Sequence, residues 1–170
     1  MKTLSYGRQF IDDDDIDAVV AVLKGDWLTQ GPSVKEFEER FAEYVGTSYA
    51  VAFANGTAAL HGAYFAAGVE AGDEVLTSAM TFAATGNAAL YLGGTPVFAD
   101  IDPSTLCLDP KAASKKLSKR TKVIAPVSYA GYPVDIAPFL ESAESCGAVV
   151  VEDACHALGA ERNGVRVGKE

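Results

Sequence analysis

Residues that could support chemistry occur in three short segments of this 170-residue chain, and the first is Asn55-Gly56-Thr57. This segment follows an apolar run and opens a stretch with helical character. A glycine lets a ligand approach the backbone, the N–H groups at a helix N-terminus point outward, and the Thr57 hydroxyl adds a donor. These features suit a phosphate group. A plain helix-capping turn uses the same residue types, so the segment fits either interpretation.

The second segment is Thr81-Phe82, which comes shortly after Thr77-Ser78 at the next expected junction between a strand and a helix. An aromatic side chain at such a junction could cover the face of a planar ligand. Taken alone, however, Phe82 is explained more simply as a core residue.

The third segment holds Asp153, which ends an apolar run over residues 148–152, and His156 three residues further on. A buried carboxylate needs a partner, so Asp153 could cap a turn, pair with a cation or face a ligand. His156 could reach the same cavity or be a hydrogen-bonded structural histidine. A pyridoxal 5'-phosphate (PLP) ring needs a phosphate cradle, an aromatic cover and an anion beside its pyridine nitrogen. Together, the three segments match these needs.

From residue 49 onward, apolar runs alternate with helix-length segments. We expect strands at 49–54, 74–77, 96–101, 122–127 and 148–152, and helices at 57–68, 82–92, 110–117 and 134–146. Continuous Val, Ala and Ile runs indicate strands covered on both faces, and the alternation implies right-handed crossovers. The sequence therefore predicts an α/β fold, a mainly parallel sheet with helices on both faces. Ligands bind beyond the carboxyl ends of such strands, where all three segments fall.

Two helices are expected before the sheet, which divides the chain into a helical segment (1–46) and an α/β domain (47–170). Asp12 to Asp15 place negative charge at the start of the first helix, and Gly25 ends it. Its apolar stripe has helical spacing and consists of Ile16, Val19, Val20 and Leu23. Ser33 and Glu36 predict a capping box for the second helix, which ends near Gly46. Near the other end, Asn163-Gly164 predicts a hairpin over 161–166.

The composition excludes several classes of function. A formal charge of -9 argues against nucleic-acid binding, which needs a basic face. The three cysteines are odd in number and lack metal-ligand spacing, so we expect no metal site and a reducing, cytoplasmic setting. The first residues contain no apolar signal-peptide core, and no apolar run approaches the ~18 residues of a membrane span. A conventional nucleotide-binding domain is disfavoured because no Gly-x-Gly-x-x-Gly follows the first expected strand.

Along nearly its whole length the chain resembles the DegT/DnrJ/EryC1/StrS family of PLP-dependent nucleotide-sugar aminotransferases. The motifs that carry the resemblance occur in family order, at 28–32, 55–60, 81–82, 94–97, 100–102, 126–131 and 152–159. The resemblance implies the large PLP domain of a fold-type I aminotransferase, with an active site formed across a homodimer. It also implies a nucleotide-linked 4-keto-6-deoxy sugar as substrate and an amino-acid donor, glutamate being the expected one.

By the same resemblance, Gly56 and Thr57 hold the phosphate, Phe82 stacks on the ring and Asp153 pairs with the pyridine nitrogen. His156 lies beside the phenolic oxygen. Thr29 and Gly31, in the motif at 28–32, are expected to contact substrate. A histidine at position 156 and the segments 6–12 and 26–31 indicate the branch that acts on UDP-linked sugars.

The resemblance also indicates what these residues lack. Family members continue into a strand with the Schiff-base lysine and then into a small C-terminal domain, so we expect the chain to be an N-terminal half, inactive alone. Lys169 matches no catalytic position. Two alternatives stay open: a family member in which histidine replaces that lysine, which would be a PLP-dependent sugar dehydratase, and a folded fragment without catalytic activity.

Overall fold

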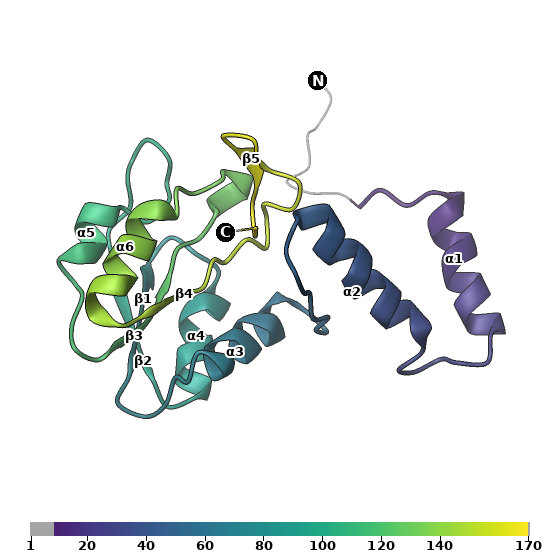
Figure 1. Cartoon of the computed structure of the whole chain (residues 1–170), viewed down its shortest axis with the longest axis horizontal. Coiled ribbons are helices and arrows are strands. Elements are labelled where there is room, and N and C mark those ends of the chain that lie inside the picture. The colour runs from purple at the N-terminus through teal and green to yellow at the C-terminus, as the bar shows by residue number, and fades with distance from the viewer. Residues whose placement is uncertain (1–8, 170) are drawn as a thin grey trace, which may run out of the picture.

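The computed structural model describes residues 9–169, and a parallel sheet forms its centre (Figure 1). The strands are β1 (Glu74–Ser78), β2 (Thr95–Ala99), β3 (Thr121–Ala125) and β4 (Val149–Val150), in the spatial order β2-β1-β3-β4. All pairs in this sheet are parallel. The α/β prediction is therefore confirmed. Burial on both faces holds for β1 and largely for β3, whereas β2 and β4 lie at the edges and are more exposed.

Helices cover both faces of the sheet because alternate strand residues point to opposite sides. Val75 and Val123 pack under α3 (Gly56–Ala66) and α4 (Ala83–Tyr91). Their neighbours Leu76 and Ile124 pack under α5 (Pro110–Ser114) and α6 (Ala137–Cys146). Two apolar clusters thus share one sheet.

The order of the strands creates a switch point between β1 and β3. The chain passes from β1 through α4 to β2 on one side, and then returns through α5 to β3 on the other side. Connections that leave neighbouring strands in opposite directions open a crevice at the carboxyl ends of those strands. The segments that follow β1, β3 and β4 meet at this crevice.

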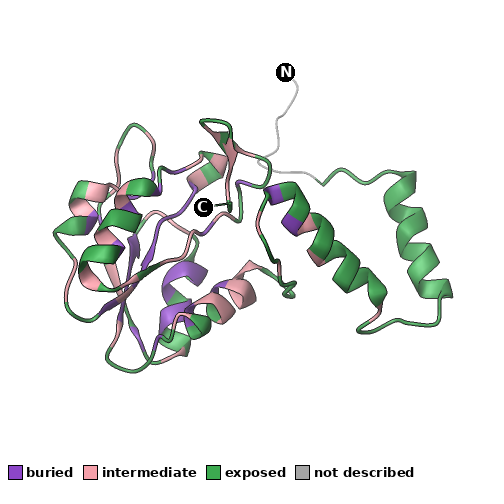
Figure 2. Cartoon of the chain, viewed as in Figure 1, coloured by how far each residue is buried: buried purple, intermediate pink, exposed green. Residues whose placement is uncertain are grey.

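Two helices, α1 (Asp13–Lys24) and α2 (Pro32–Val45), form an arm that projects from the sheet (Figure 1). Asp12 and Asp15 form a capping box at the start of α1, and Gly25 caps its end as expected. No residue of α1 is buried, and the arm is almost entirely exposed in Figure 2.

The C-terminal end of α2 packs against a hairpin made of β5 (Glu161–Arg162) and β6 (Val165–Arg166). The Arg166 guanidinium carbon lies 4.2 Å from the centre of the Tyr44 ring, and the same guanidinium donates to the Tyr44 carbonyl. Asn163 and Gly164 have φ angles of 52° and 78°, which a type I′ turn requires. The predicted hairpin is confirmed.

The predicted strand at 49–54 is wrong. These residues belong to no strand, and Tyr49 and Val51 are largely exposed. A hydrogen bond from the Ala52 N–H to Glu38 Oε1, over 2.7 Å, joins the segment to α2. An apolar run becomes a strand only when a neighbouring strand accepts its backbone hydrogen bonds, and no strand of the described chain does so.

Other expected boundaries were also wrong. α2 begins at Pro32 with Gly31 as its N-cap and no side-chain cap, so Ser33 and Glu36 form no capping box. Proline suits the first helical position because its φ is already helical, and the helix therefore starts two residues earlier than expected. Helices α5 and α6 are shorter than expected. Pro138 in the first turn of α6 places its start at Ala137 rather than near Val134.

Among the helices of residues 9–169, none is both long enough and apolar enough to cross a bilayer.

Candidate functional site

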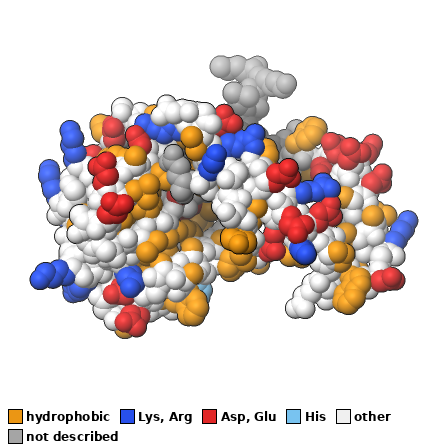
Figure 3. All heavy atoms as spheres, viewed as in Figure 1, with side chains coloured by type: hydrophobic (Ala, Val, Ile, Leu, Met, Phe, Trp, Pro, Cys, Tyr) orange, Lys and Arg blue, Asp and Glu red, His pale blue; other side chains and the backbone are white. Residues whose placement is uncertain are grey.

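A pocket of about 190 Å³ opens at the switch point of the sheet. Its lining includes all five residues that the sequence nominated for the cofactor: Gly56, Thr57, Phe82, Asp153 and His156. They come from three separate connections, which the parallel topology brings to one edge. A wider groove of about 550 Å³ lies next to this pocket, between α2, the segment 49–53 and the chain near Leu158. Figure 3 shows hydrophobic side chains gathered in the hollow between the sheet and α2.

The N-terminus of α3 forms one side of the pocket. Asn55 caps it by accepting a 2.9 Å hydrogen bond from the Ala58 N–H. The N–H groups of the first helical residues, Gly56 and Thr57, have no partner within a helix and are available to an anion. A Cβ on Gly56 would lie 2.6 Å from Cys155 Sγ, so a larger residue here would require the Cys155 side chain to shift. The local geometry therefore fits a phosphate cradle.

Asp153 also lines the pocket, and backbone hydrogen bonds just past the ends of β3 and β4 hold it in place. Its N–H donates to the Pro126 carbonyl over 2.9 Å, and its own carbonyl accepts from the Ser128 N–H over 3.0 Å. A parallel bridge joins it to Val127. The residue is only 6% exposed. Its backbone is thus fixed at the base of the pocket.

The carboxylate of Asp153 receives its strongest hydrogen bond from α4. Thr85 Oγ1 donates to Asp153 Oδ2 over 2.6 Å, and the hydroxyls of Thr85 and Thr81 are 2.7 Å apart. The Cys155 N–H donates to Oδ1 over 3.3 Å. Since a buried anion is costly unless hydrogen-bonded, these donors stabilise a negative charge at this place.

The Asp153 charge affects two neighbouring groups. Burial raises the pKa of the Tyr64 phenol, and the negative charge of Asp153 adds to the effect. Cys155 is exposed as a residue, but its thiol lies against Gly56. Desolvation raises the pKa of that thiol to about 11, and a hydrogen bond and the charge of Asp153 add to it. Both groups therefore stay neutral near pH 7.

Phe82 and His156 lie at the mouth of the pocket. Phe82 is the N-cap of α4 and is 73% exposed, so its interpretation as a core residue is wrong. His156 is also exposed, and its carbonyl oxygen would be 2.9 Å from a Cβ on Gly131. An exposed aromatic ring and an exposed imidazole are therefore placed over the pocket without being packed into the core.

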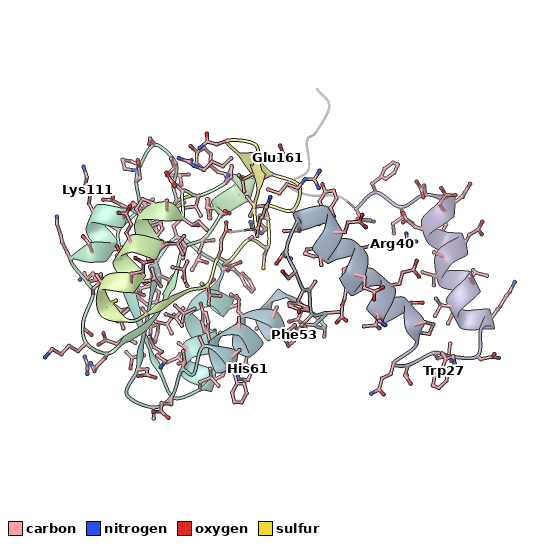
Figure 4. The ribbon with its side chains drawn as sticks, viewed as in Figure 1. Trp27, Arg40, Phe53, His61, Lys111 and Glu161 are labelled. Carbon is pink, nitrogen blue, oxygen red and sulfur yellow. The ribbon has the colours of Figure 1, made fainter. Side chains whose placement is uncertain are left out.

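The structure does not bring Thr29 and Gly31 to this pocket. Both belong to the loop between α1 and α2, at the end of α2 that is remote from the sheet, and neither lines the pocket. Trp27, labelled in Figure 4, marks the same loop. A Cβ on Gly31 would lie 2.9 Å from the Trp27 Cβ, which accounts for glycine there by local packing.

Sequence reasoning missed Thr85, which is completely buried within α4. The signal that could have found it is the spacing Thr81–Thr85, because residues four apart lie on the same side of a helix turn. It also missed Tyr129, which comes from the short 3₁₀ helix after β3 and lines the pocket.

No lysine of residues 9–169 lines the pocket. The Lys169 side chain instead runs alongside Gly46, where a Cβ would lie 3.3 Å from its Cδ.

The fold and the pocket define an α/β domain with a candidate ligand site at the carboxyl edge of a parallel sheet. Residues 9–170 match the DegT/DnrJ/EryC1/StrS aminotransferase family, and the chain belongs to that family.

Three relatives illustrate the likeness. The spore coat polysaccharide biosynthesis protein SpsC of Bacillus subtilis is 43% identical over 155 residues, which are 91% of this chain and 40% of that protein. The aminotransferase PseC of Helicobacter pylori, which is involved in the biosynthesis of pseudoaminic acid, superposes with a TM-score of 0.91 and 34% identity, covering 98% of this chain and 45% of PseC. NtdA of Bacillus subtilis was solved with bound pyridoxamine 5'-phosphate (PMP). It superposes with a TM-score of 0.83 and 34% identity, covering 88% of this chain and 35% of NtdA. The chain spans less than half the length of these relatives.

Proposed function

We propose that the pocket binds PLP and that the protein containing these residues transfers an amino group to a nucleotide-linked sugar. One observation carries the proposal: a helix N-terminus, an exposed aromatic ring and a buried carboxylate line the same pocket. Membership of the aminotransferase family supports it, as does the PMP bound to NtdA.

The residues present fit the cofactor. Gly56 and Thr57 would hold the phosphate through their N–H groups and the Thr57 hydroxyl. The position of both residues in the first turn of α3, on the pocket wall, is the observation that favours this role. Phe82 would cover one face of the ring, and His156 would lie beside its phenolic oxygen.

When bound, PLP supplies an electron sink for bond changes at the substrate carbon. Asp153 would keep a proton on the ring nitrogen, because a buried, hydrogen-bonded anion favours a positive charge next to it. Thr85 and the Cys155 N–H would hold that carboxylate in place. Phe82 would exclude water from one side of the ring.

We propose further that these 170 residues bind the cofactor but do not catalyse turnover by themselves. Amino transfer on PLP needs a basic group at the substrate carbon, ordinarily the lysine that anchors the cofactor. No lysine of the described chain lines the pocket.

For the substrate, we propose a UDP-linked 4-keto-6-deoxy sugar with glutamate as the amino donor. The activity would be that of a UDP-4-amino-4,6-dideoxy-N-acetyl-β-L-altrosamine transaminase. The similarity to PseC supports this choice, as does His156. Of the segment at 6–12 that suggested the same branch, residues 6–8 lie outside the described residues.

We also propose a cytoplasmic homodimer, divided into a helical segment (1–46) and a partial cofactor-binding domain (47–170). In it, Thr29 and Gly31 would contact substrate in the partner's site, since they lie away from the pocket of their own chain. The exposed apolar stripe of α1 supports an association of this kind. The three free cysteines suit a reducing compartment.

Two measurements on the 170-residue chain test the proposal. Calorimetric titration with PMP should show one site, and Gly56→Ala should weaken it. After incubation with PLP, borohydride should leave no lysine specifically labelled in peptide maps. Absence of PMP binding would overturn the cofactor assignment, whereas one stoichiometrically labelled lysine would overturn only the proposed inactivity.

A further inference from the structure

The side chain that controls the Asp153 carboxylate comes from a different element of the fold. Thr85 lies in the first turn of α4 and is completely buried. Its hydroxyl donates to Asp153 Oδ2 over 2.6 Å, which is short for a hydrogen bond between neutral groups and typical of a charge-assisted one between a hydroxyl and a carboxylate.

A hydroxyl has a single proton, and this fixes the direction of the next hydrogen bond. Because Thr85 gives its proton to Asp153, its oxygen must accept from the Thr81 hydroxyl 2.7 Å away. The two threonines therefore form an ordered relay that runs from the pocket lining at Thr81 to the carboxylate. Each donor in such a relay strengthens the next.

The backbone of Thr85 is held as firmly as its side chain. Its carbonyl accepts a 3.1 Å hydrogen bond from the buried hydroxyl of Tyr64, a residue of α3. The N-terminus of α3 is the candidate phosphate cradle. Tyr64 and Thr85 thus connect the helix that would bind the phosphate with the carboxylate that would face the ring nitrogen.

We propose that the Thr81–Thr85 hydroxyl relay positions the Asp153 carboxylate toward the cofactor's ring nitrogen, so that Thr85 acts as a positioning residue. The proposal rests on the proposed function, since it requires PLP or PMP in this pocket. Without the Thr85 donor, the carboxylate loses its shorter hydrogen bond and keeps the 3.3 Å bond from the Cys155 N–H, so its rotation is less restricted and its charge less stabilised.

The test compares two ligands that differ only at the atom Asp153 would contact. PMP and its 1-deaza analogue, in which C–H replaces the ring nitrogen, are titrated into the 170-residue chain. The variants are Thr85→Val, which is isosteric and lacks the hydroxyl, and Thr85→Ser, which keeps it. Thr77→Val is the matched control, because Thr77 is equally buried but its hydroxyl donates to the Ala125 carbonyl.

We expect Thr85→Val to weaken PMP binding about tenfold, the effect of one hydrogen bond to a charged group. The 1-deaza analogue should bind with unchanged affinity. Thr85→Ser should restore PMP binding, and Thr77→Val should alter neither ligand. In an Asp153→Asn background, Thr85→Val should have no further effect, because the relay acts through the carboxylate.

Other results would contradict the proposal. Equal weakening of both ligands would mean that Thr85 only shapes the pocket, and unchanged PMP affinity would mean that it positions nothing. If Thr85→Val does not fold, Thr81→Val removes the outer hydroxyl from a less buried place. Thr81→Val should weaken PMP binding by less than Thr85→Val does and should leave the affinity for the 1-deaza analogue unchanged. Unchanged PMP affinity in Thr81→Val would contradict the relay. Failure of the unmodified chain to bind PMP would overturn the proposed function itself, and with it this inference.

Discussion

The carboxyl edge of the sheet and the two-helix arm are both rich in apolar residues, but they bury these residues to very different degrees. Around the site, Tyr64, Thr85 and Ala88 are completely inaccessible. In the arm, α1 has a regular apolar stripe and buries none of it, and Leu23 is 63% exposed. The difference shows that an amphipathic sequence pattern specifies a helix and its apolar face, but not the surface against which that face packs. The residues proposed to hold the cofactor all line one pocket of the packed part of the chain, whereas the apolar stripe of α1 stays exposed.

The largest expected effect separates the two regions by stability. Phe139→Ala removes a completely buried ring from the cluster under α6 and should lower the free energy of unfolding by about 3–5 kcal/mol. Phe37→Ala truncates the same side chain on α2, where the ring is half exposed, and should cost about 0.5 kcal/mol or less. Urea denaturation of both variants measures the contrast. Similar losses would show that the arm is packed as tightly as the sheet.

A smaller effect is expected at the phosphate cradle. Gly56→Ala places a methyl group 2.6 Å from Cys155 Sγ, and this overpacking should cost about 1–3 kcal/mol. Cys155→Ala removes the sulfur, so the double variant should recover most of the loss. Gly62→Ala is the control: its methyl would meet the tip of the half-exposed Phe53 ring, which can move away. If Gly56→Ala proves as stable as Gly62→Ala in thermal denaturation, the close fit at the cradle is wrong.

Removing a helix cap should lower the free energy of unfolding more for a packed helix than for an exposed one. Asn55→Ala removes the cap of α3, a packed helix, and should lower the free energy of unfolding by about 1 kcal/mol. Asp12→Ala removes the capping box of α1, which buries nothing, so only local fraying should follow. Global unfolding followed by fluorescence, together with amide hydrogen exchange in α1, distinguishes the two outcomes. Equal effects on global unfolding would contradict the comparison.

The smallest expected change concerns reactivity and leaves the fold intact. Because the pKa of the Cys155 thiol is raised to about 11, little thiolate exists near pH 8 and alkylation by iodoacetamide should be slow. Asp153→Asn removes a hydrogen bond and a negative charge, so the midpoint of the rate–pH profile should move to lower pH. Desolvation persists and should keep it above the value of an ordinary thiol. Peptide mapping separates Cys155 from Cys107 and Cys146; an unchanged profile would mean that Asp153 does not act on this thiol.

Features of the fold could be predicted from the sequence where a short segment is compatible with only one local structure. Asn163-Gly164 specified its turn because only certain residues accept two positive φ angles, and Asp153 was placed correctly because strand ends share an edge. Residues 49–54 were misassigned because pairing depends on a neighbouring strand, which no local pattern reveals. Thr85 was missed for a related reason: a threonine inside a helix has many uses, and its partner lies 68 positions away in the chain.

The central claim is that Asp153 faces the ring nitrogen of a cofactor in this pocket, and the protonation state of that nitrogen tests it most directly. PMP labelled with ¹⁵N in the ring is bound to the unmodified chain and to Asp153→Asn, and its chemical shift is followed by NMR as the pH is raised. The unmodified chain should keep the nitrogen protonated well above the pH at which free PMP loses that proton, and the variant should not. The same titration curve for both proteins would contradict the account.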